Sequence, residues 1–462
     1  MNDLVRTNQW ALLEPLLSAA LRSSSFQRSR LPGGFSLPRS LEAFVRDFPP
    51  TTKGELATDQ AQHPPSGSNW TQPEASYGRF SQTSGTTGRP MAVWDTAESW
   101  SWLLENWVRG FELAGVKPGM RAFFAFSFGP FLGFWTAFEA GLRMGLRCIP
   151  GGGLGTTARL HAILQHRVEV LCCTPTYALH LATTAQNQGL SLSSSAIRRI
   201  IVAGEPGGSL PGVRRQIEAA WRGAAVVDHY GLTEVGPVAF ARAGEPGHLC
   251  VFEDRYFAEV LDPETLLPVT DGACGELVLT PLGRSAWPLF RYRTGDLVRP
   301  RQTDAGLVLE GGILGRIDDM VVVRGVNIYP GAVEEVVRGV AGSCEYRVSL
   351  TGRTGLVQIE VEVEAPPYTP CSSAAPSVPP EDAPLQSDSQ EHPLVFQERT
   401  HPSLSSQRIA ERPIQPDGGV RSLASSLEAA LERAFALRIP VREVAHGTLP
   451  RFDLKAHRWV RV

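Results

Sequence analysis

The chain has 462 residues, enough for two or three domains, and 42% of them are hydrophobic, as in an ordinary globular protein. A formal net charge of −3 argues against nucleic acid or an anionic membrane surface as a partner. The seven cysteines have no regular spacing, the opening residues show no signal-peptide pattern and no run of 18 apolar residues occurs, so a cytoplasmic protein without a membrane helix is expected.

The first half of the chain alternates predicted helices with predicted strands. Residues 1–30 have leucines at helical spacing, and Pro15 is expected to kink or interrupt that helix. The polar, Pro-rich stretch 57–76 predicts a surface loop. Helices are predicted over 96–114, 131–145, 156–167 and 176–188, and strands over 121–127, 148–150, 168–173 and 200–204. This alternation favours a parallel sheet covered by helices on both faces, with ligands at the carboxyl ends of its strands.

The second half of the chain has a different pattern. Short apolar runs separated by Asp-Pro and Asp-Gly turns predict a β-rich subdomain over about 247–314. A boundary near Asp318 divides a large N-terminal domain, 1–317, from a small α+β domain, 318–462. Within the latter, 365–420 is rich in Pro, Ser, Gln and Glu, which predicts a disordered linker. The predicted fold class is therefore α/β, with helix-covered parallel sheets, a β-rich subdomain and a small mobile C-terminal domain.

One short stretch is dense in hydroxyl groups and glycines. It consists of Thr83, Ser84, Gly85, Thr86, Thr87, Gly88 and Arg89. Glycines let a backbone approach a ligand closely, and successive N–H groups can form a concavity that binds anions. The stretch is not a Walker A loop, because no lysine follows Gly88. Taken alone, it fits a phosphate-binding loop and an ordinary flexible turn about equally well.

Three further motifs follow this loop in order. They are His229-Tyr230-Gly231-Leu232-Thr233-Glu234, Tyr292-Arg293-Thr294-Gly295-Asp296-Leu297 and Gly315-Arg316-Ile317-Asp318-Asp319-Met320. Together with the loop, they resemble the adenylate-forming superfamily of acyl-CoA synthetases, adenylation domains and luciferases. Residues 290–296, 323–330 and 449–451, the last shortly before Lys455, resemble its phenylacetate–CoA ligase branch. The resemblance runs from about Leu37 to the C-terminus, except for 366–420, where the family does not normally carry so long an insertion.

The resemblance implies that the protein activates a carboxylic acid, expected to be aryl, with Mg²⁺ and ATP. Acyl-AMP forms, pyrophosphate leaves, and the thiol of coenzyme A then takes the acyl group. Two alternatives stay open: transfer to a carrier-protein thiol or an amine, and a non-catalytic protein that binds a nucleotide or acyl-adenylate. The implied partners are a small carboxylic acid, with a carrier protein or a second copy of the chain as further candidates.

The same resemblance assigns roles at the phosphate end of ATP. The 83–89 loop would hold the β- and γ-phosphates, with Arg89 supplying charge because Met91 stands where many relatives have a lysine. Glu234 matches the Mg²⁺ ligand and Thr233 a contact to the α-phosphate, a task that suits hard oxygen ligands. Lys455 matches the lysine that reaches the α-phosphate and the carboxylate. The alternatives are a solvent-facing glutamate after a turn and a lysine on a basic tail.

At the nucleoside end, Asp296 would accept hydrogen bonds from the ribose hydroxyls and Arg316 would contact ribose or phosphate. Gly204, Glu205 and Pro206 resemble the family's adenine-side segment, and Tyr230 would pack against the base. His229 and Gly231, from the same motif as Tyr230, are also expected among the nucleotide-binding residues. Taken without the motifs, Asp296 would be a turn residue, Arg316 a surface salt bridge and 204–206 a loop after a strand.

The acid pocket and the hinge complete the expected site. Phe128 stands where the phenylacetate branch places an aromatic side chain near the substrate ring, and Gly129 and Phe131 belong to the same segment. Aromatic lining suits a flat apolar acid, although core packing explains Phe131 as well. Asp318 matches the hinge about which the small domain turns after adenylation.

Overall fold

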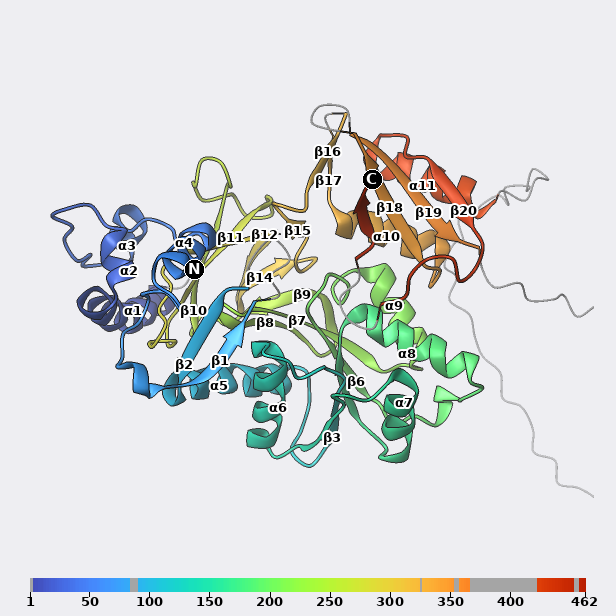
Figure 1. Ribbon diagram of the computed structural model, residues 1–462, viewed down its shortest axis with the longest axis horizontal. Helices are drawn as coiled ribbons and strands as arrows, with labels where there is room; N and C mark the ends of the chain where they lie inside the picture. The colour runs from blue at the N-terminus through green and yellow to red at the C-terminus, as the bar shows by residue number, and fades with distance from the viewer. Residues whose placement is uncertain (1–2, 84–89, 325, 353–356, 366–421, 453–456) are drawn as a thin grey trace, which may run out of the picture. The chain divides into compact units, whose positions relative to one another are not determined.

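The computed structural model describes residues 3–83, 90–324, 326–352, 357–365, 422–452 and 457–462 (Figure 1). Residues up to 365 and from 423 onward belong to one compact unit. The predicted linker over 365–420 lies, after Ala365, outside the described residues. In the part of the chain that is described, no helix is both long and apolar enough to cross a membrane.

The largest sheet has nine strands and joins a parallel half to an antiparallel half. In sheet order its strands are β13 (Pro300–Thr303), β14 (Gly306–Glu310), β9 (Glu245–Val251), β8 (Gly236–Arg242), β7 (Ala225–Leu232), β6 (Arg199–Val202), β5 (Val170–Cys173), β3 (Arg121–Phe124) and β4 (Arg147–Pro150). The pairs from β4 to β7 are parallel, and those from β7 to β13 are antiparallel. The sheet therefore changes character at β7, and the predicted α/β class with a parallel sheet is confirmed.

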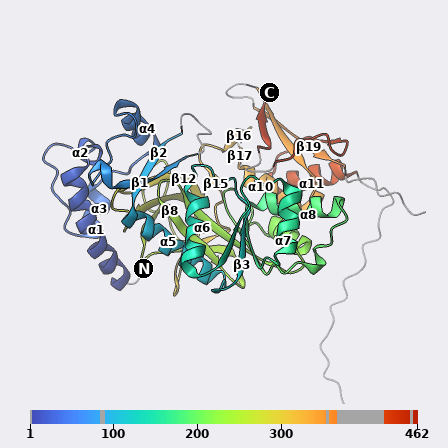
Figure 2. The same ribbon diagram turned by 60° about the horizontal axis from the view of Figure 1, so that its bottom comes forward.

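Helices cover both faces of the parallel half, because its strand residues alternate between two apolar clusters. On β3, Ala122 and Phe124 face one cluster, while Phe123 faces the other. The helices are α5 (Ala97–Leu113), α6 (Leu132–Met144), α7 (Thr156–Gln165), α8 (Pro175–Asn187) and α9 (Pro211–Ala220). Helices α5 and α6 pack on the first cluster and α7, α8 and α9 on the second. Figure 2 shows α6 and α7 on opposite sides of β3.

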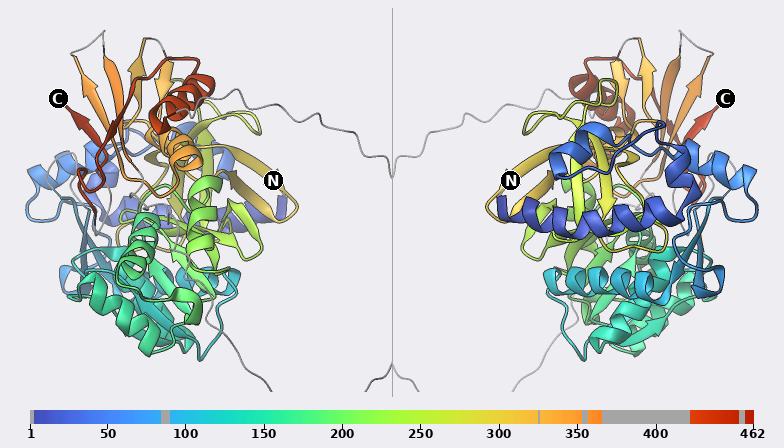
Figure 3. Two further views of the ribbon diagram at one scale, coloured as in Figure 1. Left: turned by 90° about the vertical axis from the view of Figure 1, so that its right-hand side faces the viewer. Right: turned by 90° about the vertical axis from the view of Figure 1, so that its left-hand side faces the viewer.

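A second, antiparallel sheet carries the N-terminal helices. Its strands, in order, are β10 (Tyr256–Leu261), β11 (Gly275–Pro281), β12 (Tyr292–Val298) and β15 (Gly315–Arg316). The helices are α1 (Asp3–Ser23), α2 (Ser25–Ser29), α3 (Leu41–Asp47) and α4 (Lys53–Gln62). Figure 3 shows α1 beside this sheet, where Leu13, Leu17 and Phe44 pack on Phe257 and Phe290. The predicted β-rich region is thus divided between this sheet and the antiparallel half of the larger one.

Two details of the N-terminal region differ from what the sequence predicts. Helix α1 is not interrupted at Pro15, one of the two outcomes expected there, because its buried face on the second sheet offsets a proline penalty of about 3 kcal/mol. Residues 57–62 are not a loop but the end of α4. That helix begins with a capping box in which the side chains of Thr52 and Glu55 satisfy each other's backbone N–H groups. A short 3-10 turn, η1 (Glu74–Ser76), follows, and another, η2 (Leu192–Ser194), follows α8.

The phosphate-loop candidate sits in a hairpin of its own. Strand β1 (Tyr77–Gln82) pairs antiparallel with β2 (Ala92–Thr96). At the base of the hairpin, the Thr83 N–H donates to Met91 O at 3.1 Å, and the Met91 N–H donates to Thr83 Oγ1 at 3.0 Å. Thr83 and Met91, which lie on either side of this segment, are therefore joined by two hydrogen bonds.

The last part of the described chain forms a small α+β assembly. A hairpin of β16 (Val321–Val323) and β17 (Val326–Ile328) precedes α10 (Pro330–Ala341), β18 (Tyr346–Thr351) and β19 (Gln358–Glu364). After 422 come α11 (Leu423–Phe435), β20 (Val441–Val444) and β21 (Trp459–Arg461). The sheet order is β20-β19-β18-β21, and the two helices share one apolar cluster with it.

Candidate active site

Glu234 is a buried acid next to β7, the strand at which the large sheet changes from parallel to antiparallel pairing. It lies with Thr233 in the turn between β7 and β8 and is 3% exposed. The Tyr292 hydroxyl donates a hydrogen bond to Glu234 Oε1 at 3.1 Å, and Lys53 Nζ lies 3.3 Å from the same oxygen. Among the residues that the structure describes, one hydroxyl and one ammonium contact this carboxylate, which leaves it oxygen lone pairs for a further ligand.

Asp296 is the second buried acid and lies on β12, four residues after Tyr292. The Tyr230 hydroxyl donates to Asp296 Oδ2 at 2.6 Å, and Arg316 Nη1 donates to Asp296 Oδ1 at 3.2 Å. Arg316 also donates through Nε to Asp318 Oδ1 at 2.8 Å. Burial raises the pKa of Asp296 to about 6, against the opposing effects of the Tyr230 hydrogen bond and the Arg316 charge.

The two acids are joined by a reciprocal arrangement across two sheets. Tyr230 of β7 donates to Asp296 of β12, while Tyr292 of β12 donates to Glu234, which follows β7. Burial raises the pKa of both tyrosines well above the usual value, so the phenols stay protonated and act as donors. Two motifs more than 50 residues apart in the sequence thereby form one site.

Lys53 reaches this site from the start of α4, and sequence reasoning gave it no role. The preceding Thr51 extends the second sheet: its N–H donates to Arg291 O at 2.9 Å, and the Arg293 N–H donates to Thr51 O at 2.8 Å. The capping box at Thr52 then starts α4, so Lys53 emerges beside Tyr292. The capping box was visible in the sequence, but nothing in the sequence pointed from Lys53 to Glu234.

The predicted adenine-side residues Gly204, Glu205 and Pro206 lie in the loop that follows β6, and this loop contacts β7. Gly204 has φ +91°, a left-handed conformation that favours glycine. The Thr176 N–H donates to Glu205 Oε1 at 2.8 Å, so this carboxylate serves the first turn of α8. Further along the loop, the Ser209 hydroxyl donates to Asp228 Oδ2 at 2.5 Å. Pro206 lies against Gly331, near the start of α10.

Asp228 is a further buried acid that sequence reasoning missed, although it directly precedes the motif that begins at His229. Burial raises its pKa to about 6, opposed by the Ser209 hydrogen bond. His229, in contrast, directs its ring into the core, where it stacks on Phe240 at 4.0 Å. Burial lowers the pKa of His229 to about 3, so the ring is neutral. Gly231 must lack a side chain, because a Cβ there would lie 2.7 Å from Gly236 O.

The predicted acid-pocket segment lies next to the base of the loop hairpin. The Gln82 N–H donates to Pro130 O at 2.8 Å. Phe128 has φ +54°, and its ring packs edge-on against Trp135 and Phe138 at 5.2 and 5.5 Å between centroids. Further contacts in this aromatic cluster include the Trp135 indole N–H to Gly129 O at 3.0 Å, Phe131 to Phe134 at 5.7 Å and Phe126 stacked on Phe134 at 4.4 Å.

Several predicted residues cannot be placed. Ser84, Gly85, Thr86, Thr87, Gly88, Arg89 and Lys455 lie outside the described residues. Their roles stay predictions, and only the Thr83 end of the loop is positioned.

Glu234 fits a magnesium ion, because in nucleotide sites Mg²⁺ is usually held by one or two carboxylates together with phosphate oxygens. The carboxylate is a hard oxygen donor, and Lys53, 47% exposed in its side chain, can move off it. Among the described residues, no three His, Cys, Asp or Glu side chains are grouped so as to hold a metal by themselves. Phosphate oxygens would therefore complete the coordination.

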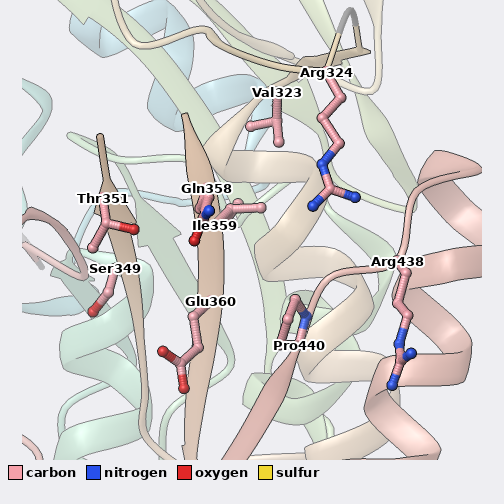
Figure 4. A pocket seen from close by; sticks show the side chains of 9 residues that line it. All are labelled: Val323, Arg324, Ser349, Thr351, Gln358, Ile359, Glu360, Arg438 and Pro440. Carbon is pink, nitrogen blue, oxygen red and sulfur yellow. The ribbon is translucent and has the colours of Figure 1, made fainter. Parts of the chain in front are cut away.

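A separate cavity of about 200 Å³ lies in the small α+β assembly. Figure 4 shows Arg324 and Arg438 on one side of it and Ser349 and Thr351 on the other. Arg438 is already in an ion pair with Glu428 at 2.7 Å. None of the residues predicted for the site lines this cavity.

Comparisons with known proteins agree with this geometry. A family model described as AMP-binding enzyme matches residues 45–281. The chain is 33% identical over 344 residues to phenylacetate-coenzyme A ligase of Thermus thermophilus, covering 72% of this chain and 75% of that protein. It is 31% identical over 374 residues to phenylacetate-coenzyme A ligase of Pseudomonas putida, covering 77% and 84%. The solved structure of 2-hydroxyisobutyryl-CoA ligase in its postadenylation state shares the fold, with a TM-score of 0.81 at 24% identity over 98% of this chain and 88% of that one.

Proposed function

The chain belongs to the AMP-binding enzyme family, and we propose that it activates a carboxylic acid with ATP and transfers the acyl group to coenzyme A. The observation that supports this most directly is the reciprocal pairing of Tyr230 with Asp296 and of Tyr292 with Glu234. Asp296, the proposed ribose acceptor, and Glu234, the proposed metal ligand, are both buried. Relatives that are phenylacetate-coenzyme A ligases cover most of the chain.

The proposed reaction has two steps. A carboxylate oxygen of the acid attacks the α-phosphorus of ATP, the bond to the bridging oxygen breaks, and pyrophosphate leaves with the electron pair. The thiolate of coenzyme A then attacks the acyl carbon, and AMP leaves with the oxygen that came from the acid. The protein must orient the reactants and stabilise charge, because the bond changes themselves need no covalent enzyme intermediate.

Five residues of the candidate site take part in this scheme. Asp296 accepts hydrogen bonds from the ribose, and Arg316 orients Asp296 and adds positive charge. Thr233 and Glu234 face the phosphates, where a bound Mg²⁺ would neutralise phosphate oxygens. Lys53 is a second cation at this end of the site. It offsets the missing lysine at position 91, where Met91 is buried instead.

Other parts of the scheme rest on the family resemblance. We propose that the 83–89 loop holds the outer phosphates, that Lys455 meets the α-phosphate and the carboxylate, and that Asp318 is the hinge of a small domain beginning there. The aromatic segment around Phe128 favours an aryl acid. The described cysteines are all free thiols, which fits a reducing cytoplasm. A carrier-protein thiol or an amine is the alternative acceptor, and a homodimer is a further proposal.

The test is acid-dependent release of pyrophosphate from MgATP, with a panel of aryl and short-chain acids, without and with coenzyme A. Release with one class of acid that increases with coenzyme A is expected. Release that coenzyme A does not change would assign the acceptor to a carrier protein or an amine. No release with any acid, from protein that binds ATP, would contradict the ligase and favour a nucleotide-binding protein.

A further inference from the structure

A fully buried arginine lies directly behind the turn that carries Glu234. Arg284 is in the loop between β11 and β12, and its side chain has no exposed surface. Its Nη1 donates to Thr233 O at 2.7 Å and to Glu234 O at 2.9 Å. Buried carbonyls in a turn lack ladder partners, so a donor at this place satisfies two groups that would otherwise be unpaired.

These two carbonyls are the ones that control the direction of the Glu234 side chain. One belongs to the peptide group before the Glu234 Cα and the other to the peptide group after it. Hydrogen bonds to both carbonyls restrain the peptide groups on either side of the Glu234 Cα, and with them the backbone dihedrals that set the direction of the Cα–Cβ bond. A single guanidinium therefore restrains the backbone from which the proposed metal ligand extends, without touching its carboxylate.

The guanidinium is itself held by an acid, Asp95, from the hairpin formed by β1 and β2. Arg284 Nε donates to Asp95 Oδ1 at 2.7 Å and Nη2 donates to Asp95 Oδ2, so the pair is bidentate, and Asp95 is as fully buried as Arg284. Such a fork-to-fork pair sets the plane of the guanidinium as well as its position. Asp95 lies on β2, and Met91, directly before this strand, donates its N–H to Thr83 Oγ1.

The rest of the turn is held by a second buried side chain. The Tyr256 hydroxyl contacts Val235 O at 2.9 Å and Pro237 O at 3.0 Å. Four carbonyls around Glu234 therefore have partners from the protein interior. Arg284 is the charged one of the two donors and the one that connects to the loop hairpin.

We propose that Arg284 is a positioning residue for Glu234, and that the Asp95–Arg284 pair sets how strongly the site takes Mg²⁺ with ATP. This inference rests on the proposed function, because it assigns Glu234 to the metal. A lysine at position 284 keeps the charge, but its single ammonium cannot reproduce the planar fork that meets one acid and two carbonyls at once.

The test uses Arg284→Lys with Arg291→Lys as a matched control. Arg291, from the same loop, makes a bidentate pair with Glu259 and donates to two carbonyls, Val45 O and Phe48 O. ATP binding is measured by calorimetry over a series of Mg²⁺ concentrations, and adenosine binding is measured without metal. We expect Arg284→Lys to raise the Mg²⁺ concentration for half-maximal ATP binding about tenfold, with adenosine affinity within about twofold of the unaltered protein.

Arg291→Lys is expected to leave the Mg²⁺ requirement and the adenosine affinity within about twofold of the unaltered protein, even if it lowers the melting temperature as much as Arg284→Lys does. Asp95→Asn is the second variant, in case Arg284→Lys does not fold, and it should raise the Mg²⁺ requirement in the same direction. An unchanged Mg²⁺ requirement in the folded variants would overturn the proposal, as would an equal rise in Arg291→Lys or an equal loss of adenosine affinity.

The design separates this inference from the proposed function. Acid-dependent pyrophosphate release by the unaltered protein is measured in parallel, and its absence would contradict the ligase alone, because the Mg²⁺ titration follows ATP binding and needs no turnover. An unaltered protein whose ATP binding does not depend on Mg²⁺ would overturn the positioning role.

Discussion

Arg284 and Arg291 lie seven residues apart in one loop and make the same set of contacts in two different regions. Each uses Nε and Nη2 to grip one carboxylate, Asp95 for Arg284 and Glu259 for Arg291. Each uses Nη1 for two backbone carbonyls. Both pairs are buried, so their local chemistry does not distinguish them.

What differs is the backbone that each arginine holds. The carbonyls of Val45 and Phe48 are at the end of α3, where a helix leaves orphan acceptors, so Arg291 caps a helix and joins it to the second sheet. The carbonyls that Arg284 holds flank Glu234, an acid with unused oxygen lone pairs. The same motif therefore gives stability in one place and, in our proposal, the geometry of a ligand site in the other.

The largest expected effect comes from neutralising one acid in each region. Glu234→Gln should lower acid-dependent pyrophosphate release by about 100- to 1000-fold, because an amide cannot balance the charge of a metal on the phosphates. Glu259→Gln should instead lower the free energy of unfolding by about 3 kcal/mol, since it leaves Arg291 buried without its partner. Its rate per folded molecule should be unchanged. Steady-state rates and urea unfolding measure the two effects, and a Glu234→Gln rate within about tenfold of the unaltered protein would contradict the comparison.

The next effect separates stability from function within the Arg284 pair. Arg284→Met alone should lower the free energy of unfolding by about 3–5 kcal/mol, because it strands the Asp95 charge in the interior. Adding Asp95→Asn should restore about 1–3 kcal/mol of that loss. The Mg²⁺ requirement should not recover, because Thr233 O and Glu234 O still lack their donor. If stability and the Mg²⁺ requirement recovered together, Arg284 would be a stabilising residue only, like Arg291.

A smaller effect compares two buried acids that are each paired with an arginine. Burial raises the pKa of Asp296 to about 6 and raises that of Glu259 as well. Above pH 6 Asp296 is ionised and accepts from the ribose, whereas below pH 6 it is protonated and loses this capacity. Adenosine affinity should therefore fall about tenfold from pH 7 to pH 5, as expected for one group with this pKa.

Adenosine is the probe for this experiment because it has no group that titrates between pH 5 and pH 7. Asp296→Asn should bind adenosine weakly and without this pH dependence. Glu259→Gln and Asp228→Asn should both keep it. A pH profile that follows Asp228→Asn instead would assign the titration to Asp228, whose pKa burial also raises to about 6.

The smallest effect concerns Lys53, which lies between the region held by Arg291 and the turn that carries Glu234. It follows the segment that Arg291 anchors at Phe48, and it reaches Glu234 as a half-exposed ion pair. Lys53→Met should change the free energy of unfolding by less than about 1 kcal/mol, as for other exposed pairs. It should weaken ATP binding about three- to tenfold through the lost charge. Arg291→Lys, which leaves Lys53 itself unchanged, should affect ATP binding less than Lys53→Met does and stay within about twofold of the unaltered protein, so a larger effect would break the comparison.

Much of the fold followed from local patterns in the sequence. The alternation of strands and helices between residues 96 and 204 gave the parallel sheet, because each element there carries its own periodicity. The uninterrupted α1 and the helix α4 depart from the sequence prediction for different reasons. Tertiary packing overrode the proline in α1, while the capping box at Thr52 was a local signal that was not used. Helix α9 was also not predicted, although Pro211 stands at its start.

The site was predictable only where a motif named its residues. Tyr230, Glu234, Asp296 and Arg316 all belong to motifs, and the structure brings them together. Their supports do not belong to motifs. Asp95 and Arg284 are 189 residues apart and meet through the tertiary fold alone, as do Lys53 and Glu234. No periodicity or composition marks such pairs, because each partner has ordinary neighbours in the sequence.

The most direct test of the central claim is to supply the acid with oxygen-18 in its carboxylate and analyse the AMP formed with coenzyme A. Transfer through acyl-AMP moves a carboxylate oxygen onto the α-phosphorus, so we predict AMP that carries a single labelled oxygen and pyrophosphate that carries none. Unlabelled AMP with labelled pyrophosphate, or ADP with labelled phosphate, would mean that the acid attacks another phosphorus and would contradict activation as an acyl-adenylate.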